Sequence, residues 1–169
     1  AGGCTLVKSF AAMSTLTELR IDSCGFGAES AVCFGDLIRS NPSLTVLETV
    51  NCDLGPKGGE ALADGLGGSL ALKEFHVRRC RLAAGSASAI ANALAGNPPL
   101  VQLDLSSEDL GEAGCAEILS ALGGSVHNTT LRSLRLWNCG FGDEAATGLK
   151  STLETNTTLA VLSLSCENV

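Results

Sequence analysis

The sequence contains no tyrosine and one tryptophan, and aromatic residues make up only 4% of its 169 positions. It also lacks long apolar runs, which excludes a membrane-spanning helix, because such a helix needs about 20 consecutive apolar residues. No charged segment followed by an apolar one resembles a signal peptide at the N-terminus. We therefore expect no membrane insertion.

Basic residues are scarce. Eleven Lys and Arg stand against 18 Asp and Glu, which gives a net charge of −7. Binding to phosphates needs a basic surface, so nucleic acid is not expected as a partner, and anionic membranes are disfavoured for the same reason. The 45% apolar fraction and the length fit one folded domain with a sizeable core.

The residue sets of familiar catalytic and metal sites are absent too. No Cys-x-x-Cys occurs, and only His76 and His127 could complete a zinc site. The glycine-rich segments that begin at Gly55 and Gly65 lack the spacing of a phosphate-binding loop. No Ser-His-Asp constellation follows from the pattern. We therefore expect no enzyme activity, cofactor, metal or small-molecule substrate.

An internal repeat organises the chain. Segments of the form Leu-x-x-Leu-x-Leu-x-x-Cys-x-Leu, the last of them cut short, start at Leu16, Leu44, Leu72, Leu100, Leu131 and Leu159. The starts are 28, 28, 28, 31 and 28 residues apart, and the three extra residues lie near 125–128. The alternating apolar residues predict a short strand with one buried face, and apolar pairs four residues apart predict a helix in the second half of each unit.

One strand and one helix of this size cannot bury their apolar faces alone, whereas stacked copies can. Strands stack about 4.8 Å apart and helices about 8–10 Å apart, so the helical side is longer and the stack curves. We predict an α/β solenoid, or horseshoe, with parallel strands on the concave face and helices on the convex face. It covers residues 1–169 as one segment, with partial units at 1–15 and 159–169 that indicate either a longer parent protein or ends covered by a partner.

This pattern resembles the leucine-rich repeat family, and the 28-residue period with its Cys-x-Leu-Gly turn resembles the ribonuclease-inhibitor-type class. The class includes ribonuclease inhibitors, sensor domains of NOD-like receptors, Ran GTPase-activating proteins and ciliary scaffold proteins. The resemblance implies the same solenoid and a role in binding proteins. The chain departs from the pattern at Thr49, which replaces a strand leucine, and at Glu108 and Glu167, which replace the turn cysteine.

Eight cysteines raise the question of disulfides. Those that stand eight residues after a repeat start, where the family carries Asn or Cys, are Cys24, Cys52, Cys80 and Cys139. We interpret them as buried free thiols rather than as a disulfide ladder or metal ligands. Cys33 and Cys115 are interpreted as small apolar helix residues, and Cys166 as the best candidate for a reactive thiol. Abundant reduced cysteine favours the cytoplasm.

Asparagine recurs three residues before four of the repeat starts, at positions 41, 97, 128 and 156. Asn128 and Asn156 are each followed by Thr-Thr, which matches the glycosylation acceptor pattern. Asparagine also tolerates the left-handed conformation that ends helices. We favour this structural role at all four positions.

Strand residues that do not face the core should face the concave surface. They vary from repeat to repeat while the buried positions stay constant, as expected for a recognition surface on a fixed scaffold. The concave positions that we predict to bind a protein are Arg20, Asp22, Glu48, His76, Arg78, Arg79, Asp104, Arg135 and Trp137.

Trp137 is the most specific of these candidates, since Trp and Arg are the residues most enriched at binding hot spots. In one interpretation it anchors an acidic or mixed partner surface, flanked by Arg135 and Arg78. In the other it covers its neighbours or packs against Arg135 within the chain. His76 stands level with Glu48 and Asp104, an arrangement open to proton transfer but more simply read as a solvated charge ladder.

We therefore predict a non-catalytic scaffold that binds a protein partner through its concave face, as part of a larger protein or assembly. One alternative is a GTPase-activating regulator that resembles the Ran GTPase-activating proteins. Another is a structural subunit of a ciliary or cytoskeletal assembly. No family residue for GTPase activation can be transferred to this chain.

Overall fold

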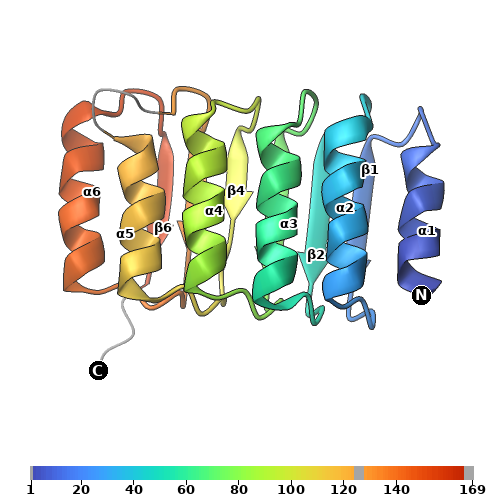
Figure 1. The fold of residues 1–169 in the computed structure, drawn as a ribbon. Coiled ribbons are helices and arrows are strands. Elements are labelled where there is room, and N and C mark those ends of the chain that lie inside the picture. Colours follow the sequence, from blue (N-terminus) through green and yellow to red (C-terminus); the bar gives the residue numbers. More distant parts are fainter. Residues whose placement is uncertain (1, 124–127, 166–169) are drawn as a thin grey trace.

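The computed structural model describes residues 2–123 and 128–165. Helices and strands alternate along them (Figure 1). The helices are α1 (Gly2–Ala11), α2 (Ala28–Ser40), α3 (Gly55–Gly67), α4 (Ala84–Ala95), α5 (Gly111–Leu122) and α6 (Asp143–Thr155). The strands are β1 (Glu18–Asp22), β2 (Val46–Val50), β3 (Glu74–Arg78), β4 (Gln102–Asp104), β5 (Ser133–Leu136) and β6 (Val161–Leu164).

The strands form one parallel sheet in sequence order, from β1 to β6. Figure 1 shows the helices side by side in one layer and the strands in a second layer behind them. Each strand pairs in register with the next, so that Glu48 lies beside His76 and Asp104 beside Arg135. The predicted α/β solenoid with strands on one face and helices on the other is confirmed.

The core lies between the two layers. In β1 to β3 alternate residues are buried, and the inward positions are filled by leucine, isoleucine, phenylalanine and valine. The exception, Thr49, is fully buried and lies within hydrogen-bond reach of the Cys80 thiol through its carbonyl and its hydroxyl oxygen. The polar side chain therefore costs little where the sequence pattern expects leucine.

Helices α2 and α3 approach each other closely at two glycines. A Cβ placed on Gly65 would stand 2.6 Å from the Cα of Gly35 and overlap its carbonyl oxygen. Such a distance is far inside van der Waals contact, so only glycine fits there. Gly67, at the end of the same helix, has only ordinary contacts, because its Cβ would stand 3.7 Å from the Cβ of Ala93.

Asparagines connect successive repeats, and Asn41 and Asn128 are buried while Asn156 is partly buried. The side-chain Nδ2 of Asn41 donates to Met13 O at 3.2 Å, and that of Asn128 donates to Leu94 O at 2.8 Å. In both residues Oδ1 also accepts a hydrogen bond from a backbone N–H. The donor is the leucine three residues later, which starts the next repeat. Asn156 repeats the arrangement, with Leu122 O at 2.7 Å.

The left-handed backbone expected of the four asparagines occurs only at Asn97, with φ of 53°. Asn41 and Asn156 are extended and act through their side chains. The expectation was wrong for them because the extended backbone lets the side-chain amide form hydrogen bonds with backbone groups of two repeats. A left-handed helix cap would pair fewer backbone groups. Their structural role is confirmed, and the full burial of Asn128 leaves no room for a glycan.

Cysteines 4 and 33 form a disulfide between α1 and α2. This corrects the interpretation of Cys33 as a small apolar helix residue. The two helices pack side by side and bring the Cα atoms within 5.6 Å, a separation that a disulfide spans. The described free cysteines are Cys24, Cys52, Cys80, Cys115 and Cys139. All are buried except Cys24, which is exposed in the turn after β1, so the prediction of a buried thiol was wrong for it. Cys166 and His127 lie outside the described residues.

Candidate protein-interaction face

The parallel register places the predicted binding residues in rows across the sheet, on the face away from the helices. One row runs through Arg20, Glu48, His76, Asp104 and Arg135. A second runs through Asp22, Val50 and Arg78, and Trp137 follows β5 at the same edge of the sheet. We keep the name concave face for the surface that these rows form.

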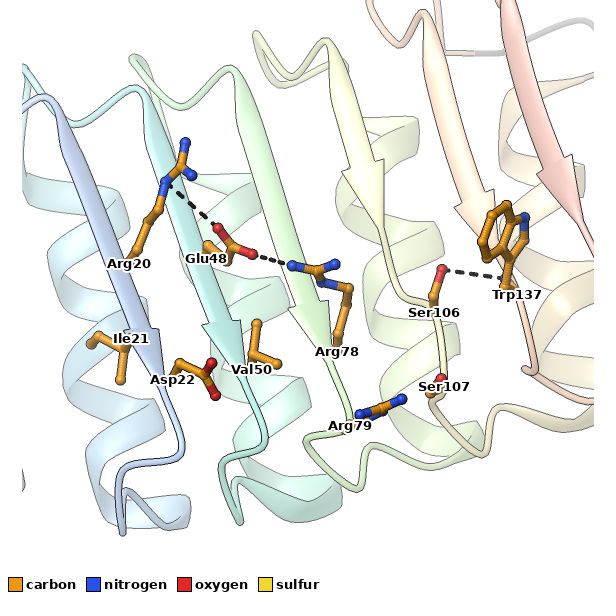
Figure 2. A pocket seen from close by; sticks show the side chains of 10 residues that line it. All are labelled: Arg20, Ile21, Asp22, Glu48, Val50, Arg78, Arg79, Ser106, Ser107 and Trp137. Carbon is orange, nitrogen blue, oxygen red and sulfur yellow. Dashed lines mark hydrogen bonds and ion pairs between the residues drawn. The ribbon is translucent and has the colours of Figure 1, made fainter.

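Two shallow hollows lie on this face. The first, of about 490 Å³, is lined by residues that include Arg20, Glu48, Arg78, Arg79 and Trp137 (Figure 2). The second, of about 430 Å³, shares much of that lining and adds His76, Asp104 and Arg135. All nine predicted residues therefore line one or both hollows.

Glu48 is the centre of the charged network in the first hollow. Its Oε1 accepts a hydrogen bond from Nη2 of Arg78, and its Oε2 lies 3.6 Å from Nε of Arg20. Figure 2 shows the two arginines pointing at the carboxylate from either side. Arg20 is bound to Glu18 as well. One carboxylate from β2 thus holds arginines from β1 and β3.

His76 and Asp104 occupy the register positions that the sequence predicts, but their side chains contact other groups. His76 lies level with Glu48 and Asp104, but its Nε2 is 3.5 Å from Oε2 of Glu74 on its own strand. Asp104 is only 6% exposed, and its Oδ1 accepts the backbone N–H of Ser106 at 3.0 Å. It lies beside Arg135, but no ion pair joins these two described residues. Asp104 therefore shapes the strand end.

Trp137 is 55% exposed, although it is a large apolar residue. Its backbone N–H donates to Oγ of Ser106 at 3.4 Å, which holds the backbone at the strand end without involving the indole. Over the part of the chain that the structure describes, the one ring contact is between Phe26 and Phe34, so no ring or cation–π contact holds the indole. This arrangement favours the first interpretation, in which Trp137 is available to a partner.

Arg79 follows β3 at the rim of the first hollow and is exposed. It adopts a left-handed backbone with φ of 54°, a conformation that costs energy for a long side chain. Its counterparts in the other turns are short polar residues in the same conformation, namely Ser23, Asn51, Ser107 and Asn138. Within the described residues, Arg79 has no ion pair.

Ser106 and Ser107 also line the first hollow, at the concave and rim positions that the repeat spacing assigns to them, but serine carries no signal that would have singled them out as binding residues. The unpaired polar groups of this face could not be predicted. Nε of Arg78 and Oγ of Ser133 are buried without a hydrogen-bond partner. Such unmet groups depend on side-chain rotamers, which a pattern does not specify.

Glu108 is a buried carboxyl group that takes the place of a turn cysteine. It is 1% exposed and lies below the concave rim, where burial raises the pKa of Glu108 to about 7 despite hydrogen bonds from the backbone of Cys80 and Leu82. The group is enclosed by turn backbone rather than open to a hollow. We therefore assign it to the scaffold.

Within residues 2–123 and 128–165, no three His, Cys, Asp or Glu side chains gather as a metal site would require. Over the same residues, no helix combines the length and the apolar composition needed to cross a bilayer.

Comparison with known proteins agrees with the fold. Three segments, residues 12–35, 40–63 and 127–150, match the family model for the leucine-rich repeat. Among solved structures, the chain is similar to leiomodin-1 actin-binding site 2, with 22% sequence identity and a TM-score of 0.62. The match covers 99% of this chain and 79% of that chain. No curated protein matches. The fold is thus a leucine-rich-repeat solenoid.

Proposed function

We propose that the protein is a non-catalytic scaffold that binds a protein partner through its concave face. The observation that carries the proposal is Trp137, a tryptophan left 55% exposed beside a hollow lined by arginines. A large apolar side chain of this kind, set among cations, is characteristic of an interface hot spot. The preformed sheet keeps the ordering cost of binding small.

Affinity capture with matched variants tests this proposal. The protein is immobilised and exposed to an extract of the cells that express it, and bound proteins are quantified by mass spectrometry. We expect a partner that is retained by wild type and by the helix-face variant Lys57→Asn, and lost with Trp137→Ala. A partner lost with the helix-face variant but kept by Trp137→Ala would refute the concave face as the binding surface.

The structural likeness supports a second candidate. The solved neighbour is named as an actin-binding site, so we also propose actin or a cytoskeletal assembly as a candidate partner. Sedimentation with actin filaments and binding to labelled actin monomers test it directly. The absence of binding in both assays would remove actin and leave the scaffold proposal intact.

We further propose that the repeats are of the ribonuclease-inhibitor type, which the 28-residue spacing supports. A cytoplasmic location is proposed from the five described free cysteines, and the disulfide between Cys4 and Cys33 is the feature that stands against it. Alkylation during lysis of the source cells, followed by mass spectrometry of these two cysteines, decides the point. Alkylated Cys4 and Cys33 would support a cytoplasmic location, whereas an intact disulfide between them would support an oxidising compartment.

A further inference from the structure

The cations of the first hollow are not equivalent. Arg20 and Arg78 share the carboxylate of Glu48. Arg79, in contrast, has no ion pair within the described residues, and Figure 2 shows its guanidinium directed across the rim toward Ser107. Arg78 also retains donors, because Glu48 accepts from one of its two Nη groups and the side chain is partly exposed. The hollow therefore presents unmet cationic donors beside an exposed indole.

Arg79 occupies a position at which a shorter residue would fit better. The corresponding turns carry serine or asparagine in the same left-handed conformation, and asparagine adopts it at little cost. Strain of this kind persists where the surrounding structure imposes it, and it concentrates at binding sites. Within the described part of the fold, the side chain of Arg79 makes no ion pair that would offset this strain. Its guanidinium is therefore available to bind an anionic group of a partner.

The surroundings restrict what can approach. Asp22 and Glu48 line the same hollow, and the chain carries a net charge of −7. A polyanion such as nucleic acid would place phosphates against these carboxylates, whereas a single carboxylate can reach Arg79 and avoid them. A carboxylate also matches the planar fork of a guanidinium, which binds it through two parallel hydrogen bonds.

We propose that the hollow binds an aspartate or glutamate side chain from an extended segment of the partner protein. Its carboxylate accepts hydrogen bonds from Arg79, with Arg78 as the second cation. The indole of Trp137 packs against an apolar neighbour of that residue in the same segment. This inference rests on the proposed function and adds the chemistry of the partner to it.

A random peptide library displayed on phage provides the probe. The folded protein is the bait, and peptides enriched on wild type are sequenced and synthesised in two forms. The first form of each peptide keeps every Asp or Glu. The second form, its amide twin, carries Asn or Gln at those positions and so lacks the negative charges. Fluorescence anisotropy then measures the affinity of both forms for wild type, Arg79→Asn, Trp137→Ala and the control Lys57→Asn, which removes one positive charge on the exposed side of α3.

We expect enrichment of peptides with a fixed Asp or Glu, and an affinity at least about tenfold lower for the amide twin. Arg79→Asn should reduce this preference to about twofold or less, while Lys57→Asn leaves it unchanged. Arg79→Asn relaxes the backbone, so loss of binding would not reflect unfolding.

Other outcomes separate the two proposals. Enriched peptides that lack an acidic residue but need Trp137 would overturn the acidic segment and leave the concave face standing. Peptides that bind all variants equally would overturn both. If no peptide is enriched, a single extended segment is not what this hollow binds, and affinity capture still decides whether the concave face binds a protein.

Discussion

The carboxylate of Glu108 lies beneath the turn of the preceding repeat, where its Oε1 accepts the backbone N–H of Cys80 at 2.5 Å. Its Oε2 accepts the N–H of Leu82 at 2.7 Å. In the next repeat, Cys139 stands at the corresponding position and its thiol donates to Leu105 O at 3.1 Å. The fourth repeat is therefore bound to the preceding one by a carboxylate that accepts hydrogen bonds. The third and fifth repeats use a cysteine thiol that donates one at the same position.

Stability should fall as pH rises through the range in which Glu108 titrates. Burial raises the pKa of Glu108 to about 7, from 4.5 in the unfolded chain, so the folded state binds more protons between these values. The free energy of unfolding should thus decrease by up to about 1.4 kcal/mol per pH unit in that window. Urea denaturation between about pH 5 and pH 8 measures this slope. Glu108→Gln should flatten it, and an equal slope in the variant would assign it to other groups.

Replacement of Arg79 by asparagine should stabilise the fold. The left-handed backbone at Arg79 costs a long side chain more than it costs asparagine, so we expect a gain of about 0.5–1 kcal/mol. Chemical denaturation provides the measurement, and Lys57→Asn, on a helix, should show no gain. A lower midpoint for Arg79→Asn would mean that the arginine contributes packing that outweighs the strain.

Trp137→Ala should separate binding from stability. Trp137 is 55% exposed, so the free energy of unfolding should change by less than about 0.5 kcal/mol, while partner affinity should fall by about 2 kcal/mol, or roughly 30-fold. The matched change Leu134→Ala, at a fully buried position of β5, should cost about 2–5 kcal/mol of stability. Unchanged affinity of Trp137→Ala would remove this residue from the interface.

Two glycines of α3 should respond oppositely to alanine. Gly65→Ala forces a methyl group against the backbone of Gly35 and should destabilise the protein by about 1–3 kcal/mol, even though alanine favours the helix. Gly67→Ala meets only ordinary contacts and should be neutral or stabilise by up to about 1 kcal/mol. Thermal denaturation of both variants tests the contrast, and equal shifts would show that α2 and α3 can separate freely.

Thiol labelling should discriminate among the free cysteines. Cys24 is exposed, whereas burial raises the pKa of Cys80 to about 11 and that of Cys139 to about 12. We expect a maleimide reagent at neutral pH to modify Cys24 first and the buried thiols only after unfolding. Mass spectrometry of peptides from a labelling time course identifies the order. Early labelling of Cys139 would show that its turn opens in the native state.

The repeat spacing predicts the backbone arrangement of the concave face, because a register of one repeat per strand determines which side chains stand level. The repeat spacing does not predict which of these side chains are free of contacts within the chain and so available to a partner. Asp104 is level with Arg135 yet turns to the backbone of Ser106, and Glu48 is shared by two arginines. These outcomes depend on rotamers and on competition between partners. The disulfide of Cys33 also escaped prediction, since it depends on how closely α1 packs against α2.

The asparagines that link successive repeats have a mechanical consequence. Each of Asn41, Asn128 and Asn156 reaches back to a carbonyl of the repeat before it and, with the same amide, holds the leucine that starts the following repeat. A repeat that detaches therefore uncaps its predecessor, and the damage passes along the stack in one direction. Repeats linked in this way should melt together rather than one at a time, so that the concave face is either wholly presented or wholly lost.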